Sequence, residues 1–240
     1  MTALENGPVV ARPEVLAART ESTLAAVADE VTALGRRAVA VPTDVSDADA
    51  QDNLVNLTMA EFGKIDILMN SAFVQPPQVP LLDVDLDDMR HWTDINVLAS
   101  VGLVQKMAEH LVRARGAVVL INSVVLRNRA LRFGAYRMHK FALLAAARSL
   151  SMELGPKGVR INSVAPGYIW SDKVQGFFRK RADQLGIAPE EVFEQVSQTV
   201  DLRRFPTPEE IADAAVFLSS DLASGVTGQC LDVTCGEVHH

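Results

Sequence analysis

Short apolar runs alternate with longer amphipathic stretches along the whole chain. The short, mostly aliphatic runs predict strands buried on both faces over residues 15–18, 38–41, 65–69, 117–121, 160–164 and 230–233. Apolar residues at helical spacing predict helices between them, over residues 21–34, 47–62, 86–114, 135–154 and 208–218. Strands and helices that alternate in this way predict an α/β fold with a doubly wound parallel sheet, in three layers with helices on both faces.

The predicted elements form one domain over residues 1–240, because no repeat, linker or low-complexity segment interrupts them. The last helix has a clear start, with Thr207 as N-cap, Pro208 in the first helical position and Glu210 placed for a capping box. Residues 170–206 have no predicted helix or strand and follow a strand end, where a substrate lid belongs. The aromatic residues of this segment suit an apolar substrate wall and a contact between subunits equally well.

The composition excludes several classes of protein. The 240 residues carry a net charge of −7, and the isoelectric point is about 5.3, which argues against a nucleic-acid-binding protein. No stretch approaches the roughly 18 uninterrupted apolar residues of a membrane span, and the first residues lack the pattern of a secretion signal. We therefore expect a soluble, cytoplasmic protein that does not bind membranes. Cys230 and Cys235 fit neither a zinc pattern nor a disulfide framework, so no metal site is predicted.

Tyr136 and Lys140 are the first candidates for catalysis. They stand four positions apart in a predicted helix, so both side chains project from one face, about one turn apart. A phenol titrates near 10, and acid–base work at neutral pH needs its pKa lowered by roughly 3 units, about 4 kcal/mol. A nearby cation shifts the pKa in that direction. Ser123, just after the preceding strand, offers a hydroxyl that can hydrogen-bond a substrate oxygen as its charge changes.

A Tyr–Lys pair is also ordinary on an exposed helix, so the pair alone does not define a site. In context, however, Ser123, Tyr136 and Lys140 resemble the Ser and Tyr-x-x-x-Lys signature of the short-chain dehydrogenase/reductase family. The resemblance covers almost the whole chain from Val15 onward and implies a Rossmann-like oxidoreductase. It also implies that Tyr136 exchanges a proton with the substrate, Lys140 holds a cofactor ribose and Ser123 orients the substrate oxygen.

Two segments after predicted strands indicate the adenosine end of a dinucleotide. Asp44 and Val45 resemble the family's Asp-Val pair, which implies contacts with adenine. Asp44 could equally be the N-cap of the following helix, although Ser46 serves that role well. Arg19 follows the first predicted strand, where dinucleotide folds carry an acid for NAD or a nearby Arg for the extra phosphate of NADP. Its planar, permanent charge suits that phosphate, and Ala18 leaves no acid to repel it. The sequence therefore favours NADP(H), with NAD(H) possible; a surface Arg at a helix start is the alternative.

Two asparagines continue the resemblance. Asn70 and Ala72 match the family's Asn-Asn-Ala-Gly motif, which implies cofactor binding, whereas Ser71 and the bulky Phe73 depart from it. Asn96 lies inside a predicted helix, where asparagine is a poor helix former. By resemblance, Asn96 bends this helix, and its backbone carbonyl holds a water that links the catalytic lysine to solvent. An asparagine that distorts the helix without a catalytic role is the alternative.

The last third of the chain carries the remaining resemblances. Pro166 and Gly167 match the family's Pro-Gly turn, which implies that the backbone approaches the nicotinamide there, with Ile169 nearby. Residues 227–236 resemble the closing strand of the family, which commonly lies at a subunit interface. A homodimer or homotetramer is the resulting expectation.

The start of the chain does not match. A dinucleotide-binding βαβ unit takes about 30 residues and meets the pyrophosphate with a glycine-rich turn. Here Val9 and Val10 are followed by only four residues before the next predicted strand, so about 20 residues of such a unit are missing. Either the natural polypeptide contains them, or this chain truly lacks them. We favour the first, because a parallel sheet without its central strand would expose a large apolar surface.

We therefore predict an oxidoreductase that interconverts an alcohol and a ketone with NADP(H), on a small and apolar substrate. Ser123, Tyr136 and Lys140 are the predicted catalytic residues, and Asn96 supports the proton path. A non-catalytic family member, acting as an oligomeric scaffold or binding protein without cofactor, is the alternative that the missing glycine-rich turn favours. An epimerase or dehydratase that uses the same Tyr–Lys pair is a third possibility.

Overall fold

The computed structural model describes residues 14–239, so residues 1–13, where the glycine-rich turn is missing from the sequence, lie outside the described part. The strands are β1 (Glu14–Ala18), β2 (Ala38–Pro42), β3 (Ile67–Asn70), β4 (Ala117–Ile121), β5 (Arg160–Pro166) and β6 (Cys230–Val233). Within the described range, every pairing between strands is parallel. The predicted parallel α/β fold is therefore confirmed.

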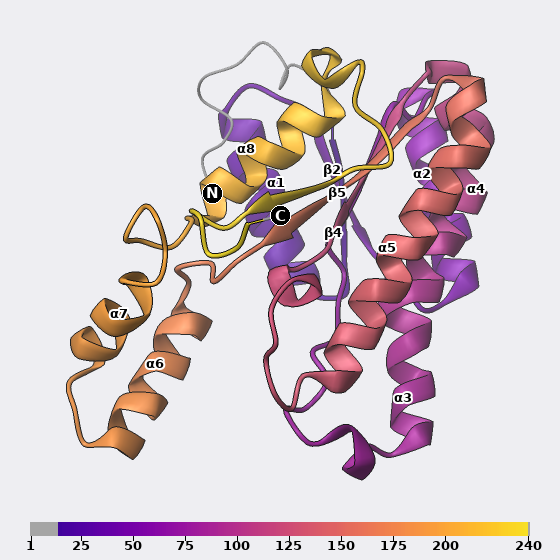
Figure 1. Cartoon of the computed structure of the whole chain (residues 1–240). Coiled ribbons are helices and arrows are strands. Elements are labelled where there is room, and N and C mark those ends of the chain that lie inside the picture. Colours follow the sequence, from indigo (N-terminus) through magenta and orange to yellow (C-terminus); the bar gives the residue numbers. More distant parts are fainter. Residues whose placement is uncertain (1–13, 240) are drawn as a thin grey trace.

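Helices cover both faces of the strands (Figure 1). They are α1 (Glu21–Ala33), α2 (Ala48–Phe62), α3 (Leu86–Thr93), α4 (Ala99–Ala114), α5 (Gly134–Leu154), α6 (Asp172–Leu185), α7 (Pro189–Ser197) and α8 (Pro208–Ser219). Helices α2, α4 and α5 lie on one face, and α1 and α8 lie on the other, which gives the three predicted layers. None of the helices in the described part is long and apolar enough to cross a membrane.

Strand β4 illustrates why the short apolar runs become strands. Successive side chains of a strand point to opposite faces. Val118 accordingly packs in the apolar cluster beneath α4 and α5, whereas Val119 packs in the cluster beneath α8. Both side chains are 0% exposed. Because helices cover both faces, each position of the strand favours an apolar residue, and no alternation with polar residues appears in the sequence.

The helix starts follow capping rules, with one correction. Thr207 caps α8 as predicted: its hydroxyl accepts a hydrogen bond from the Glu210 amide at 3.3 Å, and the Glu210 carboxylate accepts one from the Thr207 amide at 2.9 Å. Asp44, which the sequence also offers as a cap, does not cap α2. Asp47 does so instead, and its carboxylate accepts a hydrogen bond from the Asp49 amide at 2.9 Å.

The strands form two sheets that a cavity separates. β1 pairs with β2, and β3 begins a second sheet in the order β3, β4, β5, β6. β1 and β3 both line a cavity of about 1560 Å³, which we call the inter-sheet slot. Apolar side chains of strands and helices line most of it, among them Val15, Leu24, Leu68 and Val216. Among the described residues, the slot separates the sheet of β1 and β2 from the sheet that begins with β3.

Residues 170–206 contain two helices that the sequence pattern did not predict, α6 and α7, which lie to the side of the sheet beyond β5 (Figure 1). They enclose an apolar core of their own, in which Phe178 and Phe205 are 2% and 3% exposed. The segment begins and ends at one point, because the Trp170 amide donates to the Pro206 carbonyl at 3.0 Å. Most of its aromatic rings therefore pack on one another. The sequence had suggested a substrate wall or a subunit contact for them, and neither includes this local core.

Gly116 lets the end of α4 meet the start of β4, and replacing it should be costly. A Cβ at this position would lie 2.2 Å from the backbone carbonyl oxygen of Asp66, which cannot move aside as a side chain would. We expect Gly116→Ala to lower the free energy of unfolding by about 1–3 kcal/mol in urea denaturation. Gly155→Ala is the control, because no atom lies within 4 Å of a Cβ there. Equal losses in both variants would contradict this account.

Candidate active site

Ser123, Tyr136 and Lys140 come together at the carboxyl ends of the strands. Ser123 follows β4, and the other two residues occupy the first two turns of α5. The Lys140 ammonium lies 5.8 Å from the centre of the Tyr136 ring, so the two side chains share one face of the helix, as their spacing predicts. The Tyr136 hydroxyl is hydrogen-bonded to the Ser123 side chain. The three predicted catalytic residues therefore form one group.

Lys140 is held almost out of water. The residue is 4% exposed, and its ammonium donates a hydrogen bond to the backbone carbonyl of Ile121, the last residue of β4, at 2.8 Å. Burial disfavours the charged form and lowers the pKa of Lys140 to about 7. Lys140 can therefore gain or lose a proton close to neutral pH.

The expectation that Lys140 lowers the pKa of Tyr136 is wrong for this arrangement. Burial raises the pKa of Tyr136 above its ordinary value, and the hydrogen bond with Ser123 opposes the rise without reversing it. With its own pKa near 7, Lys140 is already neutral at the pH at which a phenol titrates, so it offers the phenolate little positive charge. The phenol therefore stays protonated at neutral pH.

Asn96 distorts its helix, as the sequence predicts. Residues Asp94–Leu98 form a turn of π-helix between α3 and α4, a wider turn that is frequent at functional sites. The Asn96 side chain is buried and makes two hydrogen bonds with the backbone of Val74: its oxygen accepts from the amide at 2.7 Å, and its nitrogen donates to the carbonyl at 2.9 Å. Asn96 therefore fixes the loop that follows β3.

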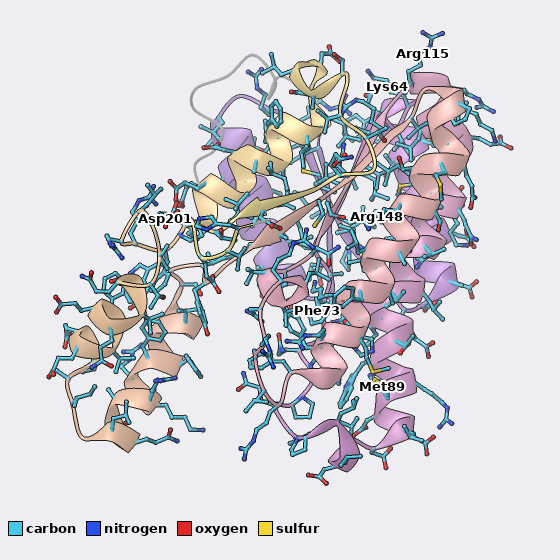
Figure 2. All side chains as sticks on the ribbon, in the orientation of Figure 1. Lys64, Phe73, Met89, Arg115, Arg148 and Asp201 are labelled. Carbon is cyan, nitrogen blue, oxygen red and sulfur yellow. The ribbon has the colours of Figure 1, made fainter. Side chains whose placement is uncertain are left out.

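Phe73, in that same loop, contacts the catalytic group. The centre of its ring lies 4.0 Å from the Lys140 ammonium, and its edge-to-face contact with Tyr136 has a centre-to-centre distance of 5.2 Å. Figure 2 shows Phe73 beneath the strand ends, beside the lower part of α5. The sequence signalled this residue only as a bulky departure from a motif that ends in glycine. Which groups its ring would touch depends on α5, which is more than 60 residues further along the chain.

Five predicted cofactor-binding residues line the inter-sheet slot. They are Arg19, Asp44, Val45, Asn70 and Ala72. The amide and hydroxyl of Ser46 donate hydrogen bonds to the Asp44 carboxylate at 2.9 and 2.6 Å, and these bonds lower its pKa, with a further contribution from the charge of Arg19. Arg19 and Asp44 therefore lie near each other at one end of the slot.

Asn70 also connects β3 to its neighbours. Its side-chain nitrogen donates to the Ser100 hydroxyl of α4 at 2.7 Å, and its oxygen accepts from the Ala72 amide at 3.0 Å. Both polar atoms of the buried amide are satisfied, so Asn70 sets the path of the loop that carries Phe73.

Pro166, Gly167 and Ile169 do not line the slot. The Gly167 amide donates to the Val233 carbonyl at 3.1 Å, and a Cβ on Gly167 would lie 2.6 Å from a carboxylate oxygen of Glu237. The close approach that requires glycine here is therefore to the C-terminal segment. Ile169 packs against the apolar cluster beneath α8.

Taken together, parallel strands covered by helices, polar residues beyond the strand ends and a buried Ser–Tyr–Lys group define an α/β oxidoreductase of the dinucleotide-binding class. Among the described residues, no group of His, Cys, Asp and Glu side chains could hold a metal ion. Both cysteines are free thiols, and burial raises the pKa of Cys230 to about 11.

Comparison with known proteins identifies the family. A family profile described as enoyl-(acyl carrier protein) reductase matches residues 13–237. The 7alpha-hydroxysteroid dehydrogenase of Escherichia coli K12 is 32% identical over 213 residues, which cover 88% of this chain and 79% of that protein. The cis-4-hydroxycyclohexanecarboxylate dehydrogenase of Sinomonas cyclohexanicum is 33% identical over 204 residues, which cover 84% and 77%. The chain belongs to the short-chain dehydrogenase/reductase family and is an oxidoreductase that acts on CH–OH groups.

Solved structures agree with this assignment. A 7 alpha-hydroxysteroid dehydrogenase complexed with NADH and 7-oxo glycochenodeoxycholic acid superposes with a TM-score of 0.85 at 30% identity, over 97% of this chain and 87% of that one. A xylitol dehydrogenase bound to NAD+ gives a TM-score of 0.82 at 26% identity, over 92% and 88%. These relatives give no support to a non-catalytic role.

The described residues fit part of a nicotinamide dinucleotide. The buried Lys140 ammonium has donor hydrogens beyond the one bonded to Ile121, which suits ribose hydroxyls, and the slot provides room beside Arg19 for the adenosine end. The glycine-rich turn expected to meet the pyrophosphate belongs before β1, outside the described residues. The described residues therefore fit the ribose and adenosine ends of the cofactor.

The buried lysine should make stability depend on pH. Unfolded lysine titrates near 10.4 and folded Lys140 near 7, so the unfolded chain binds more protons between these values. The free energy of unfolding should therefore rise with pH across this window, with a slope contribution of about 1.4 kcal/mol per pH unit. Urea denaturation between pH 7.5 and 9.5 measures this slope, and Lys140→Met should remove the contribution. The exposed Lys157→Met is the control, and parallel profiles for wild type and Lys140→Met would refute the prediction.

Proposed function

We propose that the protein interconverts an alcohol and a ketone by hydride transfer with a nicotinamide cofactor, with NADP(H) preferred. The observation that carries this proposal is the buried group of Ser123, Tyr136 and Lys140 at the strand ends. A phenol, a hydroxyl and a lysine that titrates near neutral pH can together move one proton at one substrate oxygen. When bound, the nicotinamide supplies or accepts the hydride at the substrate carbon.

Each catalytic residue has a distinct role in this proposal. Tyr136 donates its phenol proton to the substrate oxygen during reduction, and its raised pKa keeps that proton in place at neutral pH. Ser123 shares a hydrogen bond with Tyr136, so both hydroxyls can converge on one substrate oxygen. Lys140, with its pKa near 7, passes a proton between this group and its surroundings. Asn96 supports the proton path by holding the loop next to Lys140 through its two hydrogen bonds with Val74.

The cofactor would lie across the carboxyl ends of the strands, at that end of the inter-sheet slot. In this proposal Lys140 binds the ribose next to the nicotinamide, and Asn70 and Ala72 shape the loop beside it. Asp44 and Val45 lie at the adenine end, where Arg19 would bind the 2′-phosphate of NADP. By the resemblance to the family, Pro166, Gly167 and Ile169 lie on the nicotinamide side.

We also propose that residues 170–206 form a substrate lid on a single-domain, cytoplasmic protein. The position of α6 and α7 beyond β5 supports this role. Phe177 and Leu185 remain exposed on α6, at 39% and 54%, and would suit an apolar substrate. On α5, the apolar side chains of Met138, Phe141 and Met152 are also exposed, which supports a homodimer or homotetramer.

Replacing Tyr136 tests the proposed chemistry. We expect Tyr136→Phe to lower turnover at least a hundredfold, because general acid–base catalysis typically contributes about 10²–10⁴-fold. Nicotinamide absorbance, with a panel of secondary alcohols and cyclic ketones, provides the assay, and circular dichroism checks the fold. Tyr168→Phe removes the other tyrosine hydroxyl of the chain and should leave turnover largely intact. Near-normal activity of Tyr136→Phe would refute the assignment, and conversion of substrate without any absorbance change would indicate an epimerase or dehydratase.

Cofactor preference is tested separately through Arg19. Loss of a charge-assisted contact with the 2′-phosphate should weaken NADPH binding about tenfold to a hundredfold in Arg19→Ala. NADH binding should change far less, because NADH lacks that phosphate. Nicotinamide fluorescence titration measures both affinities, and Arg36→Ala, at an exposed arginine that does not line the slot, is the control. Equal losses for the two cofactors would contradict the role of Arg19.

A further inference from the structure

Phe73 is the residue at which the inter-sheet slot meets the catalytic group. Its side chain lines the slot, and the centre of its ring lies 4.0 Å from the Lys140 ammonium. Lys140 itself is not part of the slot lining among the described residues. The ring therefore lies between the ammonium and the slot.

The loop holds this ring in place from both sides. Before Phe73, the Ala72 amide donates to the side chain of Asn70, and after it, Val74 makes two hydrogen bonds with Asn96. With the backbone fixed on either side, the ring can leave Lys140 only by rotation of its own side chain.

The contacts of Lys140 explain what the ring does there. An ammonium has three donor hydrogens, and a single hydrogen bond, to Ile121, is present among the described residues. The face of the Phe73 ring, with its negative electrostatic potential, covers the ammonium instead of a second acceptor. Oxygen acceptors that enter from the slot must therefore displace this ring.

We propose that Phe73 is a positioning residue that controls the access of the cofactor ribose to Lys140, because its ring must turn away before the ribose hydroxyls can reach the ammonium. This inference rests on the proposed function, in which Lys140 binds the ribose. The apparent affinity for a ligand falls by the fraction of molecules in which the site is open. A contact between a desolvated ammonium and an aromatic ring has the strength to change that affinity about tenfold.

The first measurement follows Lys140 directly and needs no cofactor. The chain has six lysines, so the Cε signals of protein labelled with ¹³C-lysine can be titrated by NMR and assigned with Lys140→Met. Phe73→Ala should raise the pKa of Lys140 well above 7, because water from the slot then reaches the ammonium. Phe73→Leu keeps the bulk without the aromatic face, so the pKa should stay near 7 or fall.

Phe133 provides the matched control. Its ring also packs on Tyr136, with the centres 6.1 Å apart, but the cation–π contacts of Lys140 within residues 14–239 are with Phe73 and Tyr136. Phe133→Ala should leave the Lys140 titration unchanged. An unchanged Lys140 titration in folded Phe73→Ala would overturn the proposal. Should Phe73→Ala not fold, Phe73→Val takes its place with the same expected direction.

The second measurement is a binding titration with reduced nicotinamide mononucleotide. This probe carries the ribose but no adenosine half, so its binding does not depend on a pyrophosphate cradle. Phe73→Ala should bind it about tenfold more tightly than wild type, whereas Phe133→Ala should match wild type. Equal binding to wild type and Phe73→Ala would overturn the role of Phe73 and leave the proposed function intact. Absence of binding to either protein, for this probe and for NADPH, would instead overturn the proposed function.

Discussion

The exclusion of one ammonium from water is the constraint on which the candidate site depends. Lys140 is buried at the end of β4, where the carbonyl of Ile121 and the face of Phe73 replace its hydration shell. Neither partner carries a full negative charge, so the cation is only weakly compensated and its pKa falls to about 7. The same burial acts on Tyr136 in the opposite sense and keeps its phenol neutral. Tyr136 is thereby kept neutral while the neighbouring Lys140 titrates near neutral pH, which is a suitable starting point for proton transfer.

Several elements fix the loop that lies beside Ser123, Tyr136 and Lys140. The π-helical turn at Asp94–Leu98 brings Asn96 to the backbone of Val74, and Asn70 ties the other end of that loop to α4. The inter-sheet slot begins on the far side of the loop and extends to Arg19 and Asp44. The loop after β3 thus lies between the Ser123–Tyr136–Lys140 group and this cavity. Phe73 of this loop contacts both of them.

Sequence reasoning succeeded where burial alone determines structure. The runs Ala117–Ile121 and Cys230–Val233 were predicted to the residue, and the capping box at Thr207 follows from local chemistry. The helix distortion around Asn96 was implied by the resemblance to the family. Sequence reasoning failed where a residue packs against segments that are distant in the sequence or against a small local core. α6 and α7 were missed because their apolar residues face a small local core rather than the sheet. The direction of the Tyr136 pKa shift depends on burial by α5 and the loop after β3, which no spacing reveals.

The hydrogen bond from Trp170 to Pro206 has an evolutionary consequence. Because it joins the entry and exit of the segment that contains α6 and α7, the chain leaves the sheet and returns to it at nearly the same place. Insertions, deletions or wholesale replacement within this excursion need not disturb β5 or α8, since the excursion supplies its own apolar interior. Natural selection can therefore remodel this segment while Ser123, Tyr136 and Lys140 stay where they are.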